Sequence, residues 1–406
     1  MRANTIKQWL ALVGSILTVS VTLTACGGGG SSSSSTTSAT ESSSSSTASN
    51  QVTLSVAAGA ANIANMPTTS VTVCATGGSP CQTISNILVD TGSYGLRLVN
   101  SAASSVLSSL TAETTSSGAE LAECGQFVST YTWGSVRLAN VELGGETATS
   151  VPIQILGDLS ATAPSSCSDG LTEANTVSAV GANGILGVGT ALNDCGSSCA
   201  SSSVDSTYYS CPSGESCTQT TVAQSSQVTN VVSKFSSDNN GVVIALGNPS
   251  GGTASGTMTF GIGTESNNAI GSSATKLTTD AYGDLTGTLS STAYGTSFLD
   301  TGSNGLYFNA PSNVSLPTCS DDSGFYCPSS TVTMSGTLTG DNGSSSSISV
   351  SIANADTLYA DDGYALADLG GPFGYTGYLD LGLPFFFGRT VYEGFNLSST
   401  TPFVAF

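Results

Sequence analysis

Two stretches of this sequence, 210 positions apart, are near copies of each other. Residues 87–96 read ILVDTGSYGL, and residues 297–306 read SFLDTGSNGL. A single Asp-Thr-Gly-Ser is weak evidence, because Asp, Gly and Ser are common in ordinary turns. Two copies, each closing an apolar strand, indicate two similar half-molecules. We expect each half to contribute one carboxylate, Asp90 and Asp300, to a shared site.

The composition favours strands over helices. Only 8% of the 406 residues are charged and 48 are glycine, which suits a protein with many turns. The length is enough for two lobes with a substantial core. We therefore predict an all-β, bilobal molecule with a cleft between two similar antiparallel lobes. The predicted domains are an N-terminal lobe at 51–240 and a C-terminal lobe at 241–406.

Local patterns place several elements within these lobes. Alternating or apolar runs predict strands at 52–56, 71–74, 84–89, 151–156, 241–246 and 402–406. Residues 127–143 followed by Gly144-Gly145 predict a β-hairpin. Short helices are expected within 100–112 and 227–235.

The chain contains no histidine. This excludes Ser-His-Asp and Cys-His catalysis and argues against a zinc hydrolase site. Hydrolytic chemistry would have to depend on carboxylates, hydroxyl groups or backbone dipoles. We predict no metal site and no cofactor.

The N-terminus has the features of an export signal. Arg2 and Lys7 precede an apolar run at 9–23 that ends in Leu-Thr-Ala-Cys. This ending resembles a bacterial lipoprotein box, which predicts a signal peptide at 1–26 and lipidation of Cys26. Ordinary signal cleavage, with Cys26 incidental, is the alternative.

Residues 27–50, rich in Gly, Ser and Thr, form a predicted flexible linker that would hold the globular part away from a membrane. No other segment is long and apolar enough to span a bilayer. We expect a bacterial cell-envelope protein anchored by its lipid. Gly27 after the cysteine is compatible, by analogy, with the outer membrane, facing the periplasm or the surface.

Without residues 1–26 the chain has five basic and 27 acidic residues, a formal charge of about −22. Such a surface is a poor partner for nucleic acid or anionic lipid. It also suits a protein that works at low pH, where carboxylates titrate.

Ten cysteines remain after Cys26, an even number that fits disulfides in an oxidising compartment. Short separations suggest the pairs 74–81 and 319–327, and also 124–167, while the four from 195 to 217 allow three pairings. A four-cysteine zinc knot is the alternative for that cluster. The ten are Cys74, Cys81, Cys124, Cys167, Cys195, Cys199, Cys211, Cys217, Cys319 and Cys327.

The ordered motifs resemble those of pepsin-like aspartic peptidases over most of residues 51–406. That family carries Asp-Thr-Gly-Ser/Thr in each lobe and, later, apolar-apolar-Gly, matched here by residues 185–187 and more loosely by 380–382. Its flap motif Tyr-x-x-Gly-Ser matches Tyr131, Gly134 and Ser135. Residues 256–263 resemble its glycine-flanked strand, and 238–241 and 260–268 resemble an uncharacterised family of bacterial exported proteins.

The resemblance implies a pepsin-like fold and an aspartic endopeptidase that acts on peptide or protein substrates as a monomer. Two carboxyls held close together share one proton, because like charges repel, and the pair can activate a water between them. The flap tyrosine, Tyr131, would close over the substrate. The residues implied to support the dyad are Thr91, Gly92, Ser93, Thr301, Gly302 and Ser303.

One departure concerns Arg97, which stands seven residues after the first aspartate, where pepsins typically have a tryptophan. Arg97, Arg137 and Arg389 each follow a key motif. A guanidinium near the dyad would favour ionised carboxylates, whereas the alternative is that each arginine forms a structural ion pair. A silent cleft that binds peptide or glycan, or a structural surface lipoprotein, remain alternatives to the enzyme.

Overall fold

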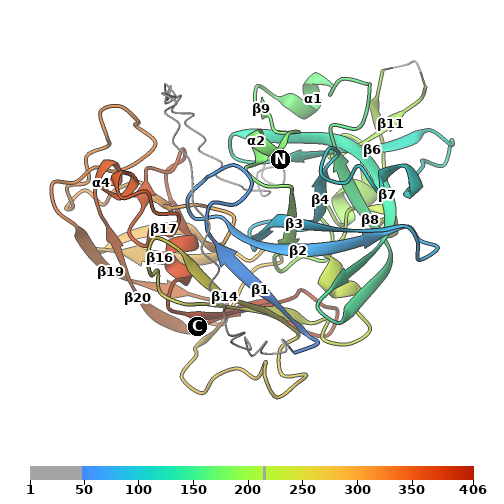
Figure 1. Ribbon diagram of the computed structural model, residues 1–406. Coiled ribbons are helices and arrows are strands. Elements are labelled where there is room, and N and C mark those ends of the chain that lie inside the picture. The colour runs from blue at the N-terminus through green and yellow to red at the C-terminus, as the bar shows by residue number, and fades with distance from the viewer. Residues whose placement is uncertain (1–47, 214–215) are drawn as a thin grey trace, which may run out of the picture.

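The computed structural model describes residues 48–213 and 216–406, and it confirms the predicted all-β, two-lobed fold (Figure 1). The strands of the described residues belong to two sheets. The first contains β1 (Gln51–Val56), β2 (Pro67–Cys74), β3 (Cys81–Asp90), β4 (Tyr94–Val99), β5 (Thr111–Ala112), β6 (Glu120–Gln126), β7 (Thr130–Leu143), β8 (Glu146–Leu156), β9 (Thr172–Glu173), β10 (Gly184–Val188), β11 (Tyr208–Cys211), β12 (Thr218–Gln219), β13 (Gly241–Leu246), β14 (Ala254–Phe260), β15 (Lys276–Thr278), β23 (Thr390–Gly394) and β24 (Phe403–Ala405). The second contains β16 (Leu285–Leu289), β17 (Thr292–Asp300), β18 (Leu306–Phe308), β19 (Val332–Thr339), β20 (Ser345–Ile352), β21 (Gly370–Gly371) and β22 (Tyr378–Gly382).

The first sheet joins the two halves of the sequence. Strand β1 pairs antiparallel with β14, which pairs with β13, and β13 pairs in turn with β23 near the C-terminus. Strand β24 then connects β23 to β15. Figure 1 shows β1 and β14 lying side by side beneath the two lobes. The lobe boundary predicted at residue 241 stays a prediction.

The two motif strands have the same surroundings. Strand β3 ends at Asp90 and pairs in parallel with β10, which pairs antiparallel with β4. Strand β17 ends at Asp300 and pairs in parallel with β22, which pairs antiparallel with β18. The near-repeat seen in the sequence is therefore a repeated three-strand unit, and each unit delivers one aspartate at the end of its first strand.

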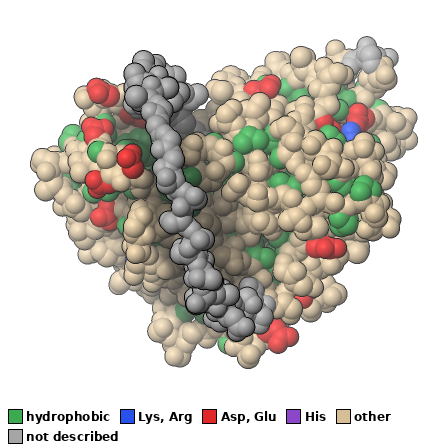
Figure 2. Space-filling model, viewed as in Figure 1, with side chains coloured by type: hydrophobic (Ala, Val, Ile, Leu, Met, Phe, Trp, Pro, Cys, Tyr) green, Lys and Arg blue, Asp and Glu red, His purple; other side chains and the backbone are tan. Residues whose placement is uncertain are grey.

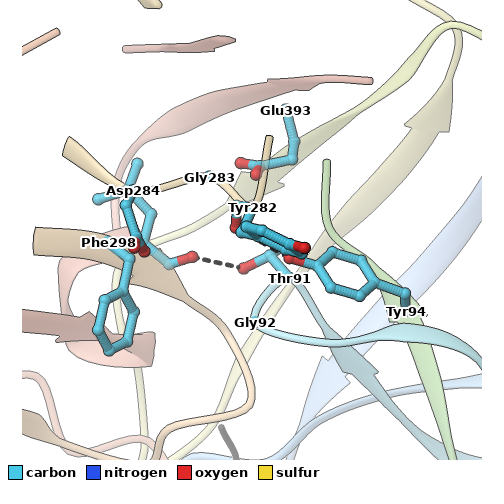
Figure 3. A pocket seen from close by; sticks show the side chains of 9 residues that line it. Thr91, Gly92, Tyr94, Tyr282, Gly283, Asp284, Phe298 and Glu393 are labelled. Atoms are coloured by element: carbon cyan, nitrogen blue, oxygen red, sulfur yellow. Dashed lines mark hydrogen bonds between the residues drawn. The ribbon is translucent and has the colours of Figure 1, made fainter. Parts of the chain in front are cut away.

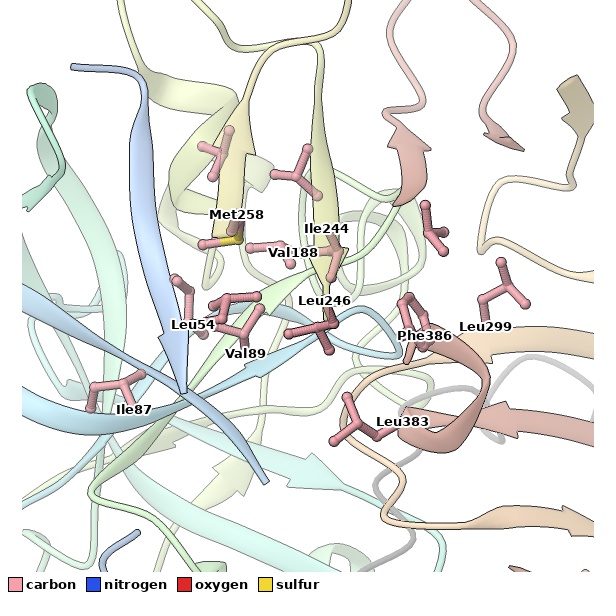
Figure 4. Packing of buried hydrophobic residues seen from close by; sticks show 14 of the residues in the cluster. Leu54, Ile87, Val89, Val188, Ile244, Leu246, Met258, Leu299, Leu383 and Phe386 are labelled. Carbon is pink, nitrogen blue, oxygen red and sulfur yellow. The ribbon is translucent and has the colours of Figure 1, made fainter. Parts of the chain in front are cut away.

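One hydrophobic cluster extends through both halves (Figure 4). Leu54 and Met258 come from the paired strands β1 and β14, and Val89 directly precedes the first aspartate. Leu299 precedes the second aspartate, and Phe386 lies in the turn after β22. All five side chains are buried. The chain segments that carry the two aspartates are thus fixed by a shared apolar core, which favours a single relative placement.

Helices are few and short in the described part of the chain. The helix expected within 100–112 is a single 3-10 turn at Leu107–Ser109, followed by β5, and the one expected within 227–235 is a 3-10 turn at Val231–Lys234. Residues 100–112 are rich in serine, and 227–235 contain three valines, a threonine and an asparagine; all of these residue types have weak helix propensity, which explains the short lengths. The others are α1 (Ser165–Ser168), α2 (Val177–Val180), α3 (Ser197–Ser201), α4 (Ala355–Ala360) and the 3-10 turns Gln224–Ser226 and Leu383–Phe386.

Five disulfides join the ten cysteines. The three pairs expected from the sequence, 74–81, 319–327 and 124–167, are confirmed. In the cluster that the sequence left open, Cys195 pairs with Cys199 and Cys211 pairs with Cys217. The zinc knot considered for those four cysteines is therefore wrong, because none of them has a free thiol.

The predicted signal peptide, Cys26 and nearly all of the predicted linker lie outside the described residues. Within the described residues, no helix is long and apolar enough to cross a membrane. On the face shown in Figure 2 the visible charged side chains are mainly acidic.

Candidate active site

The two aspartates lie together where the two halves meet. The side chains of Asp90 and Asp300 are fully buried. Each faces the other motif's glycine: a Cβ on Gly92 would lie 2.7 Å from Asp300 Cγ, and one on Gly302 would lie 2.5 Å from Asp90 Oδ1. Any side chain at either glycine would displace the opposite carboxyl group. The structure therefore brings together both predicted catalytic residues and both predicted glycines.

The two threonines hold the motifs to each other across the lobe interface. Thr91 Oγ1 donates to the carbonyl of Leu299 at 2.9 Å and accepts from the Thr301 amide at 3.0 Å. Thr301 Oγ1 donates to the carbonyl of Val89 at 2.7 Å and accepts from the Thr91 amide at 3.1 Å. Every donor in this set is satisfied by the opposite half. These contacts join the two motifs and fix the separation of the two carboxyls.

Each carboxyl also receives hydrogen bonds from its own motif. The Gly92 amide donates to Asp90 Oδ1 at 2.8 Å, and the Ser93 hydroxyl donates to Asp90 Oδ2. In the second motif, the amide of residue 302 donates to Asp300 Oδ1 at 2.7 Å, and the Ser303 hydroxyl donates to Oδ2 at 2.7 Å. These donors orient the carboxyls and stabilise negative charge on them.

The electrostatics of the pair favour one shared proton. Burial raises the pKa of Asp90 well above its ordinary value, and the neighbouring Asp300 carboxyl raises it further. Burial also raises the pKa of Asp300, while hydrogen bonds from Asp90, from Ser303 and from backbone amides oppose the increase. A pair of this kind titrates as a unit, with one proton leaving more readily than the other.

The apolar-apolar-Gly motifs explain how the two loops can turn so tightly. Gly187 lies beside Asp90 in the β3–β10 pairing, and a Cβ there would lie 2.5 Å from the Tyr94 amide nitrogen. Gly382 lies beside Asp300 in the β17–β22 pairing, and a Cβ there would lie 2.1 Å from the Gly305 carbonyl oxygen. Only glycine allows these strands to pass so close behind the motifs.

The structure places the predicted flap residues on a hairpin formed by β6 and β7. Tyr131 pairs with Gln126 near its tip, and its hydroxyl donates to Glu173 at 3.1 Å. The ring belongs to a buried cluster with Trp133. These contacts lie within the first half of the chain, and the role of Tyr131 over a substrate stays a prediction.

The other two flap residues have structural contacts of their own. Gly134 lies where a Cβ would be 1.7 Å from the Ile155 carbonyl oxygen. The Ser135 hydroxyl donates to Asp158 at 2.6 Å. These contacts account for the Gly-Ser pair as part of the β7–β8 pairing.

Two segments of the first half contact the second half close to the dyad. Val128, at the tip of the β6–β7 hairpin, packs against a cluster that contains Phe298. Asn65, fully buried, donates through its side-chain amide to the carbonyls of Asn304 at 2.7 Å and Leu366 at 2.9 Å. The sequence alone did not reveal Asn65, because a lone asparagine between strands is typical of a turn.

The arginine at the unusual position forms a buried ion-pair network. Arg97 Nη2 lies 2.5 Å from Glu123 Oε1 and 3.3 Å from Asp194 Oδ2, and all three side chains are fully buried. The Tyr208 hydroxyl donates to Asp194 at 2.7 Å. Burial raises the pKa of Asp194 well above its ordinary value, and Glu123 raises it further. The structural alternative for Arg97 is therefore the one that the geometry supports.

The other two arginines differ from each other. Arg137 forms ion pairs with Glu120 at 3.2 Å and Asp158 at 3.1 Å. Arg389 donates to the Phe385 carbonyl at 2.5 Å and lies over the ring of that residue.

A small cavity of about 20 Å³ lies between the halves, beside the first motif (Figure 3). Thr91 and Gly92 form part of its wall, and Glu393 from β23 points its carboxyl group toward the segment of Tyr282 and Gly283. This volume is enough for about one water molecule. Burial raises the pKa of Glu393 well above its ordinary value, and Asp300 raises it further. The sequence alone did not reveal Glu393, because it follows no motif.

The protein is of a class that has a buried two-carboxyl site at the interface of two similar halves. This class is defined by two aspartates on paired loops, by the reciprocal threonine contacts between them, and by the all-β, two-lobed fold. The chain belongs to the family described as protein of unknown function (DUF3443), whose model matches residues 46–406.

Comparison with solved structures found an aspartic proteinase from Irpex lacteus. It is 18% identical, with a TM-score of 0.46, and the match covers 87% of this chain and 96% of that one. No curated protein matches this sequence significantly.

Proposed function

We propose that this protein is an aspartic endopeptidase that hydrolyses peptide bonds with water activated by Asp90 and Asp300. The observation that carries the proposal is the buried carboxyl pair itself. Two carboxyls that face each other at fixed distance, each hydrogen-bonded by its own serine and glycine amide, form a general acid and a general base in one site.

The chemistry follows from one proton on the pair. The ionised carboxyl accepts a proton from water as the water oxygen bonds to the scissile carbonyl carbon. The protonated carboxyl gives its proton to the carbonyl oxygen, which yields a neutral tetrahedral diol. The C–N bond then breaks as the dyad transfers a proton to the leaving nitrogen, and one diol hydroxyl returns its proton to the dyad. The dyad ends with one proton, as it began.

Substrate entry requires part of the molecule to move. Both carboxyls are fully buried, and the Asn65 segment and the hairpin tip at Val128 contact the second half beside them. A polypeptide reaches the dyad when these contacts open, which is a step that commonly limits turnover in enzymes with flaps.

Cleavage of a diverse peptide library between about pH 3 and pH 7 tests the proposal, with products identified by mass spectrometry. Asp90→Asn and Asp300→Asn keep the shape of each carboxyl and should each abolish cleavage. Asp368→Asn, the same change at a half-buried carboxyl that is not part of the dyad, should cleave normally.

The alternative function is a silent site that binds peptide or glycan. A folded protein that cleaves nothing across this range would refute the peptidase. Peptide or glycan binding that survives both substitutions would then establish the alternative.

We also propose that the protein is exported and anchored in the bacterial cell envelope by a lipid on Cys26, and that it acts as a monomer without a cofactor. The basic, apolar and Leu-Thr-Ala-Cys segments of the leader support the anchor. The five disulfides support an oxidising compartment.

A further inference from the structure

A third buried carboxyl lies beside the dyad and has no counterpart in the first half. Asp380 is 1% exposed and lies on β22, where it pairs with Tyr307 of β18. The equivalent pairing in the first half joins Ile185 to Arg97. The second apolar-apolar-Gly motif therefore has an acid in a position that the first half fills with an apolar side chain.

Ser303 connects this acid to the dyad. Its hydroxyl oxygen lies 2.7 Å from Asp300 Oδ2 and 2.6 Å from Asp380 Oδ2. A serine hydroxyl has one hydrogen, so it can donate to one of these oxygens only. The Ser303 hydroxyl oxygen is within hydrogen-bond distance of both carboxyls. One of the two carboxyls must therefore be protonated and donate to Ser303.

The surroundings of the two carboxyls decide which of them holds that proton. Asp300 receives an amide hydrogen bond from Gly302 in addition to the serine contact, so its negative charge is well supported. Asp380 Oδ1 has no hydrogen-bond partner among the described residues. An ionised carboxylate with one bare buried oxygen is far more costly than a neutral acid in the same place.

The other groups that face Asp380 agree with a neutral acid. The titratable groups around it are Asp300 on β17, Asp90 across the interface, and Tyr307 on β18. None of these carries a positive charge that would stabilise an ionised Asp380. Burial raises the pKa of Asp380 well above its ordinary value, and Asp300 raises it further.

We propose that Asp380 is a proton-bearing positioning residue: it donates to Ser303, directs the Ser303 hydrogen to Asp300, and so makes Asp300 the ionised base of the pair. Asp90 then holds the shared proton and acts as the acid. This assignment of roles rests on the proposed peptidase activity, whereas the proton on Asp380 does not.

Infrared spectroscopy tests the location of the proton without any activity measurement. Near pH 6, well above the ordinary aspartate pKa of about 3.9, we compare the wild-type protein with Asp380→Asn. The difference spectrum should show loss of a carboxylic-acid carbonyl band. Ser303→Ala should move that band to higher frequency, because the acid loses its acceptor. Loss of carboxylate bands in Asp380→Asn would overturn the proposal.

Kinetics test the positioning role. Asp380→Ile introduces the side chain that the first half has at this position, and it removes the hydrogen-bond donor to Ser303. It should lower kcat about 2- to 12-fold and leave KM unchanged. This factor is the change in rate that corresponds to the loss of one ordinary hydrogen bond. Asp380→Asn keeps an N–H donor and should retain most of the rate, and the Asp368→Asn control should retain all of it.

The same substitution in a Ser303→Ala background separates this role from a structural one. If Asp380 acts through Ser303, Asp380→Ile should have no further effect on kcat there. An equal decrease in both backgrounds would refute the relay. If the wild-type protein cleaves no peptide, the proposed function fails, and the infrared result still decides whether Asp380 holds a proton.

Discussion

Replacing Glu393 by glutamine should make the stability of this protein less sensitive to rising pH. Glu393 is 2% exposed, its Oε2 has no hydrogen-bond partner among the described residues, and its carboxyl faces a cavity large enough for about one water. Burial, followed by the charge on Asp300, raises its pKa well above the ordinary value of 4.5. The folded protein therefore keeps this proton at pH values where the unfolded chain has lost it.

The sign of the effect follows from the raised pKa. Below the unfolded pKa both states are protonated, and the contribution to stability is fully present. Above it, the folded state binds one proton more than the unfolded state, so the free energy of unfolding falls by about 1.4 kcal/mol per pH unit until the folded pKa is reached. Glutamine has the shape of the neutral acid and cannot ionise, so Glu393→Gln removes this slope.

Urea unfolding at a series of pH values between about 3.5 and 8, with the disulfides intact, measures the effect. Fluorescence and circular dichroism must give coincident transitions for the free energies to be comparable. The two proteins should be nearly equal below about pH 4. Above about pH 5 the advantage of Glu393→Gln should grow by about 1.4 kcal/mol per pH unit and then level off.

The control is Glu265→Gln, the same chemical change at an exposed carboxyl group. Its stability curve should run parallel to that of the wild-type protein. If the curve for Glu393→Gln is also parallel, Glu393 is ionised in the folded state and the reasoning from burial is wrong.

Two further predictions concern the ion-pair network and the leader. Arg97→Met leaves the buried Glu123 and Asp194 without a cation and should lower the free energy of unfolding by about 3–5 kcal/mol, whereas the partly exposed Arg137→Met should cost about 0–1 kcal/mol, both read from urea midpoints. An equal effect of the two would contradict the burial argument. Cys26→Ser should abolish metabolic labelling with fatty acid and release the protein from membranes, and labelling that persists would refute lipidation at this residue.

The sequence predicted the fold class and the dyad because both depend on local pattern. The repeated motif required two strands ending in aspartate, and the absence of histidine removed most competing chemistries. The cysteine pairs 74–81 and 319–327 were also predictable, because each closes a short loop with no other cysteine nearby. The Cys195–Cys217 cluster was not, because its three pairings differ only in how the intervening loop folds, which no local pattern specifies.

The features that the sequence did not reveal depend on contacts between distant segments. Glu393 and Asp300 are 93 positions apart, and Asn65 reaches Leu366 across 301 positions. Asp380 is an intermediate case. It broke the apolar-apolar-Gly pattern, so a signal was present, but only the structure shows that its side chain meets Ser303. A polar residue in an apolar position of a motif was the best available indication of an additional site residue.

The third acid, Asp380, marks a position at which the two similar halves differ. Two aspartates in identical surroundings would have equal proton affinities. Each would then be the ionised base half of the time. The two halves here are nearly identical from the strand end through the serine, and they differ at Asp380 against Ile185. Because Ser303 touches both Asp380 and Asp300, while the Ser93 hydroxyl donates to Asp90, the difference acts on one member of the dyad. In the proposed relay, this one difference between the repeated units gives the two carboxyls different roles.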